Sequence, residues 1–166
     1  MKIRSSVVDD LTIARALHIV AVVLWIGGVA FVTTVLLPAV RNIPTPAERV
    51  VFFENIERRF GAQARFTTVL AGLSGIYMVV RLDIWYRFLS VSYWWMHAMV
   101  AVWLLFTLML FLAEPLFLHR WLLVRASIRP ESTFDLVERL HRILLALSLI
   151  TLIGSVLGSH GMLPSG

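Results

Sequence analysis

The stretch ALHIVAVVLWIGGVAFVTTVLLPAV, residues Ala16–Val40, contains a single ionisable side chain, that of His18. A helix needs about 20 predominantly apolar residues to cross the hydrocarbon core of a bilayer. The stretch is long enough for one crossing and too long for the apolar region of a secretory signal, and it is preceded by the acidic residues Asp9 and Asp10. We therefore expect the first transmembrane helix here.

Three more apolar runs follow along the chain. They are Phe66–Val80, Phe88–Ala113 and Ile143–Gly166, in a sequence of 166 residues that is 59% hydrophobic and has a mean hydropathy of +0.84. The sequence predicts a single all-α domain, residues 1–166, folded as an integral membrane four-helix bundle. The expected spans lie at about 13–38, 64–86, 91–117 and 140–161.

A short amphipathic cytoplasmic helix is expected before the second span. The residues Thr45–Glu48 have the form of a capping box with proline at the first helical position. Apolar residues then recur at helical spacing, at Val50, Phe53, Ile56 and Phe60. The similar stretch Ser132–Asp135 predicts that the fourth helix also begins in the cytoplasm.

Arginines gather beside the predicted spans. The first connection contains Arg41, Arg49, Arg58, Arg59 and Arg65, and the third contains Arg120, Arg125, Arg129, Arg139 and Arg142, whereas the second contains only Arg81 and Arg87. Because basic connections stay in the cytoplasm, we expect a bacterial cytoplasmic membrane protein with both termini in the periplasm. The net charge of +5 does not indicate nucleic acid, since most of these arginines border the spans. Membrane lipid is the expected surrounding, and a homo-oligomer stays open.

Histidines inside apolar runs point to a function. His18 and His97 each lie six residues into a predicted span, ~9 Å deep at a rise of about 1.5 Å per residue. An ionisable side chain at such a depth is expensive and usually functional. Two imidazoles at one level on separate helices predict an axial pair for haem b, with His160 as a third candidate. The alternative is that each histidine only bridges neighbouring helices.

Other residues bear on a cofactor. There is no cysteine, which excludes iron–sulfur clusters, thiolate zinc and covalently attached haem. Trp25 lies seven residues after His18, on the same helical face, where it could pack on a porphyrin. Small residues, which permit close helix packing and would also leave room for a flat cofactor, occur at Gly27, Gly28, Ala71, Gly72, Gly75, Gly154, Ser155, Gly158 and Ser159.

Two alternatives remain for the metal. His119 and His141, toward the cytoplasmic ends of helices, are candidates for a second haem, although 22 residues, or ~33 Å of helix, separate His119 from His97. Thioether and imidazole groups also occur together on the outer side, a combination that suits copper(I). The residues concerned are His18, Met96, His97, Met99, His160 and Met162.

Most of the chain resembles the CopD-like membrane proteins, a group that includes the HemJ-type protoporphyrinogen oxidases. The resemblance is carried by Leu17–Val20, Leu24–Gly28 and Leu37–Pro38 for their first helix, by Arg59–Phe60 and Leu73–Tyr77 for their second, and by Trp95–Met99 for their third. It implies a haem-ligand role for His18. Met99 stands where the family has a lysine, so the second ligand would be His97 or Met99. The two-haem, four-helix b-type cytochromes are similar in architecture.

Three functions are therefore considered. The first is a haem b protein that transfers electrons between quinol and an acceptor at the outer face, with porphyrinogen oxidation of the HemJ type as a special case. The second is a CopD-like protein that binds or transports copper. The third is a haemless assembly or interaction subunit whose histidines only join helices. Turnover of a substrate stays open in all three.

Overall fold

The structure is a computed structural model that describes residues 2–162, apart from the side chains of residues 2–9, 46, 47, 50, 51, 54, 57, 58, 117, 119, 123 and 127. It contains α-helices, π-helices and 3-10 helices, and no strand among the described residues. The elements in chain order are α1 (Lys2–Phe31), η1 (Val32–Leu36), α2 (Leu37–Arg41), α3 (Pro46–Leu82), η2 (Trp85–Leu89), η3 (Val91–Tyr93), α4 (Trp94–Leu108), η4 (Met109–Leu118), α5 (His119–Ile128) and α6 (Pro130–Ser159).

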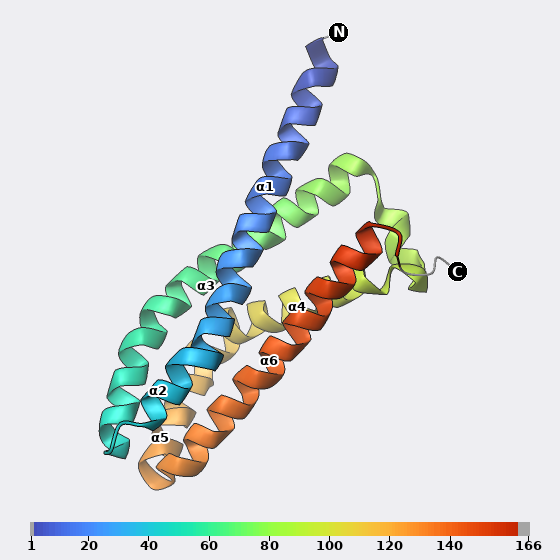
Figure 1. Ribbon diagram of the computed structural model, residues 1–166. Helices are drawn as coiled ribbons and strands as arrows, with labels where there is room; N and C mark the ends of the chain where they lie inside the picture. Colours follow the sequence, from blue (N-terminus) through green and yellow to red (C-terminus); the bar gives the residue numbers. More distant parts are fainter. Residues whose placement is uncertain (1, 163–166) are drawn as a thin grey trace.

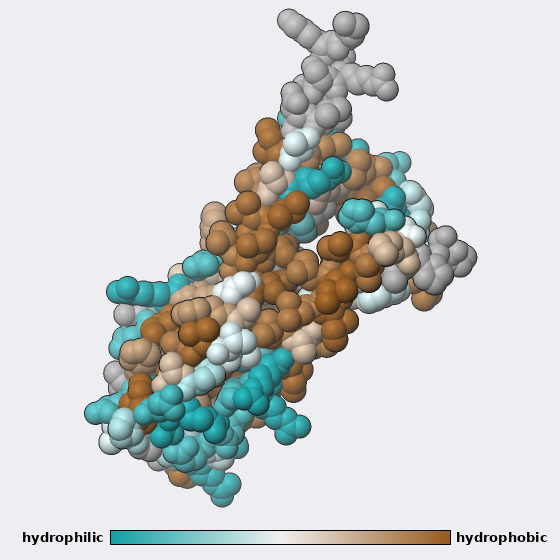
Figure 2. Space-filling view, in the orientation of Figure 1, coloured by the Kyte–Doolittle hydropathy of each residue, from teal (hydrophilic) through white to brown (hydrophobic). Residues whose placement is uncertain are grey.

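The prediction of four apolar helices is confirmed. The described helices long and apolar enough to cross a membrane are Asp10–Arg41, Arg59–Leu82, Val91–Leu116 and Pro130–Ser159. Figure 2 shows apolar residues along the middle of the molecule and hydrophilic residues at the lower end, where α2 ends and α6 begins. This distribution is what a bundle with its middle in hydrocarbon requires.

Helix boundaries differ from the expected ones in two places. The amphipathic stretch is not a separate helix, because α3 runs without a break through 37 residues from Pro46 to Leu82. Thr45 is its N-cap residue but makes no side-chain capping bond. The fourth helix begins at Pro130, ahead of the expected cap at Ser132, and the Thr133 hydroxyl donates back to the Arg129 carbonyl.

The bundle consists of two helix pairs, α1 with α3 and α4 with α6 (Figure 1). The pairs meet at Trp25 of α1 and Phe106 of α4, whose rings pack edge to face with centroids 4.9 Å apart. The buried cluster around them contains Ala21, Trp25, Val29, Ala71, Phe106 and Leu145, and so draws on all four helices. The core therefore lies near the middle of the bundle.

Aromatic rings pack where glycines leave out a side chain. An ideal Cβ on Gly72 would lie 2.5 Å from the ring of Trp103, and one on Gly158 would lie 2.0 Å from Nε1 of Trp95. Gly28 accommodates Phe60 and Gly154 accommodates Trp94 in the same way, at 2.2 and 2.6 Å. The predicted close packing at these small residues is confirmed, with aromatic side chains as the partners.

Alanine at these glycines should destabilise the bundle. We expect Gly72→Ala and Gly158→Ala each to cost about 1 to 3 kcal/mol, because the added methyl group overlaps a tryptophan ring on a neighbouring helix. Thermal unfolding in detergent, followed by circular dichroism, measures the effect. Gly27→Ala is the matched control, since its Cβ would meet nothing within 4 Å. Equal unfolding temperatures for all three variants would contradict the packing described.

Candidate cofactor site

His18 joins the helices of the first pair. Its Nδ1 lies 2.9 Å from the carbonyl oxygen of Ala71 and 3.1 Å from Oγ of Ser74, both on α3. The Ser74 hydroxyl donates to the Leu70 carbonyl at 2.6 Å, so we assign the imidazole proton to Nδ1, which donates to Ala71. Gly75 makes room for the ring, since an ideal Cβ there would be 3.3 Å from Cε1. The lone pair of His18 is then on Nε2.

His97 lies in the first turns of α4 and faces the preceding 3-10 segment. Its Nδ1 is 3.2 Å from the Tyr93 carbonyl oxygen, and its Nε2 is 3.0 Å from that of Phe88. Its ring also packs edge to face on Phe88. A neutral imidazole has one N–H and can donate to only one of these carbonyls. For Nε2 to serve as a ligand, it must leave the Phe88 carbonyl.

His160 is the C-cap residue of α6 and is exposed. Its Nδ1 lies 2.9 Å from the carbonyl oxygen of Val156, one turn earlier in the same helix. No hydrogen bond to Nε2 of His160 occurs in the described part of the chain. The imidazole is thus arranged like that of His18, with Nδ1 on a backbone carbonyl and Nε2 open.

The three histidines make their hydrogen bonds to different elements, and no described hydrogen bond or ring contact joins two of them. Figure 2 shows an opening between α1 and the carboxyl end of α6, bounded by the carboxyl end of α3 (Figure 1). His18 lies on one of the helices that border this opening, and His160 ends the other. We call this the open end of the bundle.

The other predicted contact residues are placed as follows. Trp25 is 4% exposed and belongs to the central core, with its Nε1 buried and without a hydrogen-bond partner. Met99 is half-buried on α4, Met96 is buried and Met162 is exposed. Among the described residues, no group of three or more histidine or acidic side chains is positioned to hold a metal ion.

The possible second haem site lies toward the opposite end. The Nδ1 of His141 is 2.9 Å from the Val137 carbonyl oxygen, and its ring packs edge to face against Phe53 of α3, with centroids 6.5 Å apart. The side chain of His119 lies outside the described residues. A haem held by this pair stays a prediction.

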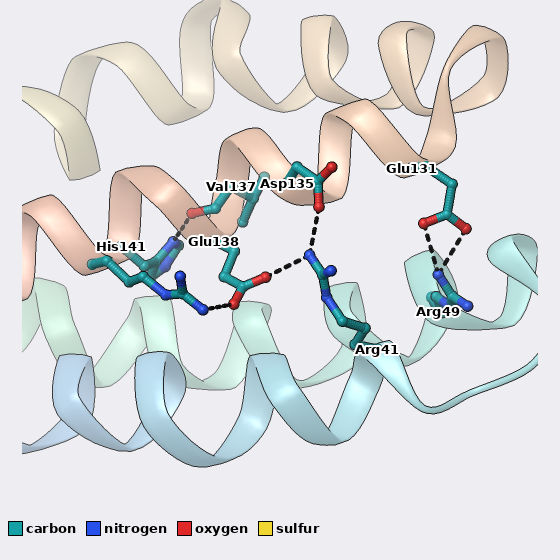
Figure 3. A network of polar contacts seen from close by, with 8 residues as sticks. Arg41, Arg49, Glu131, Asp135, Val137, Glu138 and His141 are labelled. Atoms are coloured by element: carbon teal, nitrogen blue, oxygen red, sulfur yellow. Dashed lines mark hydrogen bonds and ion pairs between the residues drawn. The ribbon is translucent and has the colours of Figure 1, made fainter.

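A network of ion pairs at that end was not foreseen. Arg41 of α2 contacts Asp135 at 2.5 Å and Glu138 at 2.6 Å, both on α6, and Glu138 also pairs with Arg142 (Figure 3). Arg49 near the start of α3 lies 2.9 Å from Glu131 of α6. We call this the ion-paired end. The sequence contains the charges concerned, because acidic residues follow Pro130 and arginines occur in the first connection. It does not say which of these charges form pairs.

A second charged pair lies within two of the apolar helices. Arg65 of α3 is 2.9 Å from Glu114, and its Nε donates to the carbonyl of Leu110 at 3.2 Å. Both partners belong to η4, a π-helix that contains Pro115. In the π-helical pattern the N–H of residue 115 would bond to the carbonyl of residue 110, and proline has no N–H. Arg65 thus supplies the hydrogen bond that Pro115 cannot.

If Arg65 replaces the missing N–H of Pro115, restoring that N–H should reduce the effect of losing Arg65. Arg65→Met should destabilise the bundle by about 2 to 4 kcal/mol, because it leaves the Leu110 carbonyl and the Glu114 carboxylate without their partner in an apolar region. Pro115→Ala restores an N–H, so we expect Arg65→Met to cost less in that background. A double-mutant cycle on thermal unfolding, with Glu114→Gln present throughout to remove the charge, isolates this term. If the changes in unfolding free energy caused by Arg65→Met and Pro115→Ala add fully, Arg65 does not replace the N–H of Pro115.

No protein-family model, curated protein or solved structure matches this chain.

Proposed function

We propose that this chain is a multi-pass protein of the bacterial cytoplasmic membrane that binds haem b and transfers electrons between quinol and an acceptor at the outer face. The observation that carries the proposal is the setting of His18. Histidines that ligate metals commonly donate the second ring N–H to a backbone carbonyl, which fixes the ring and its tautomer. His18 donates to Ala71 in this way and keeps Nε2 for a ligand bond.

The residues at the open end fit such a group. His18 would hold the haem from the first helix pair, and a residue of the second pair would hold it from the other side of the opening. His160 has an open Nε2, whereas His97 would first have to release the carbonyl of Phe88, and Met99 offers a thioether. Haem, when bound, supplies one-electron oxidation and reduction.

The chain's own contribution is to hold the imidazole of His18 still. Ala71 and Ser74 belong to a helix that packs along α1, so the ring cannot rotate without breaking a hydrogen bond between two spans. A hydrogen bond to the Nδ1–H also makes Nε2 a stronger base. The proposed topology, with the arginine-rich connections in the cytoplasm, puts the open end at the periplasmic side.

Because the chain resembles the HemJ-type oxidases, a porphyrin is a second candidate substrate class for the same site, beside quinol. A CopD-like copper function and a haemless role are the competing outcomes of the test below.

The protein purified in mild detergent should show a reduced-minus-oxidised spectrum with a sharp α-band, and a pyridine haemochrome assay should give about one haem b per chain for the open end alone. His18→Gln should lose the haem or shift its band, because the amide can still donate to Ala71 but cannot replace the imidazole on iron. Its circular dichroism and unfolding temperature should stay close to those of the unsubstituted protein.

Thr107→Val is the control, since the Thr107 hydroxyl also bonds a backbone carbonyl, that of Trp103, but lies next to the core residue Phe106 and away from the open end. Full haem content with an unchanged band in His18→Gln would overturn the assignment. A colourless protein with bound copper in elemental analysis would favour the copper function. A colourless, metal-free protein destabilised by His18→Ala would favour histidines that only join helices.

A further inference from the structure

Helix α5 continues the third apolar helix beyond the membrane. Helical residues run without a gap from Trp94 through η4 to Ile128, while the apolar span ends at Leu116. Trp121 follows Leu116 by five residues, about 7 Å at the usual helical rise. The headgroup layer on each side of the hydrocarbon is about 5 to 8 Å thick. In the proposed membrane topology, Trp121 would therefore lie at the depth of the lipid headgroups on the ion-paired side.

The side chain of Arg125 reaches back to the same depth. Its Cζ lies 5.3 Å from the centroid of the Trp121 ring, one turn nearer the membrane. Long side chains on a helix point toward its N-terminus, which here is the direction of the bilayer. Trp121 is 46% exposed, and Ile128 on the same apolar side is 71% exposed. Arg120 is adjacent to Trp121 and exposed.

Within the part of the chain that the structure describes, Arg125 has no carboxylate partner, unlike three other arginines of this end. Arg41, Arg49 and Arg142 each contact a carboxylate. Among the described side chains, no carboxylate lies within ion-pair distance of Arg125, and its Nε is buried without a hydrogen-bond acceptor. The half-buried side chain carries a charge that no described carboxylate neutralises, and a bound anion would neutralise it through the terminal nitrogens of the guanidinium.

We propose that Arg125, together with Arg120 and Trp121, binds the phosphate of an anionic phospholipid in the leaflet at the ion-paired end. The guanidinium groups match phosphate oxygens in charge and geometry. The tryptophan ring lies beside them at the boundary of headgroup and acyl chain, the position that this residue prefers. The inference rests on the membrane insertion in the proposed function and not on the haem.

The test measures lipid binding by the purified full chain in a neutral detergent, with short-chain phosphatidylglycerol as the probe. Tryptophan fluorescence titration or native mass spectrometry gives the affinity. We expect Arg125→Met to bind about fivefold more weakly, in line with the attraction of one basic side chain to an anionic lipid. Arg139→Met is the control, because Arg139 is exposed on α6 and its loss changes the net charge equally.

Phosphatidylcholine and inorganic phosphate should each bind much more weakly than phosphatidylglycerol. Equal affinity of the Arg125→Met and Arg139→Met proteins would overturn the proposal, and so would equal binding of phosphatidylcholine. Binding of inorganic phosphate alone with similar affinity would show an anion site that does not select lipid and would also overturn it. Should Arg125→Met fail to fold, Trp121→Ala takes its place with the same expected loss.

Membrane insertion is checked separately by extraction of membranes with alkaline carbonate. Release of the unsubstituted protein would count against the proposed function as a whole. If the protein stays in the membrane but Arg125→Met does not weaken lipid binding, only the proposed lipid site is wrong.

Discussion

Packing of aromatic rings against glycine holds these helices together. In lipid, apolar surface gains nothing by leaving one apolar neighbour for another, so helices associate through close contact and hydrogen bonds. Trp103 against Gly72 joins α3 to α4, and Trp95 against Gly158 joins α4 to α6. Each ring fills space that any other residue would occupy with its own side chain. The helix pairs and the position of every polar group between them depend on these contacts.

The two ends of the bundle are held in different ways. At one end Arg41 links α2 to two carboxylates of α6, next to a second buried cluster made of Val32, Leu36, Leu37 and Val40. At the other end the pairs separate, and His18 binds only its own partner helix. The ion pairs place exposed side chains such as Asp135 and Arg142 around the buried Glu138, whereas His18 lies on an apolar helix. This asymmetry leaves the open end as the place where a bound group can lie between the pairs.

The sequence predicts the four apolar helices because hydrophobic runs are determined by composition alone. The same count of residues predicts the depth of His18 in its span. It does not give the partner, because Ala71 contributes a backbone carbonyl, and any residue type has one. The hydrogen bond from Arg65 to the Leu110 carbonyl could not be predicted either, because its acceptor is also a backbone group. Pro115 only indicates that one carbonyl of this helix lacks its usual N–H partner. The sequence also predicts the amphipathic helix before the second span. The structure joins that helix and the span into one helix, α3, because no proline interrupts the chain between them.

The opening lies between α1 and the carboxyl end of α6 (Figure 2). In the proposed membrane orientation, an opening between two spans would face the acyl chains. A molecule that dissolves in the membrane reaches it by diffusion in two dimensions, at the high local concentration that partitioning produces, and never has to pass through water. A water-soluble molecule of the same size would first have to lose its hydration water, which costs free energy. With the bundle in the proposed orientation, the opening would select molecules by their solubility before any side chain contacts them.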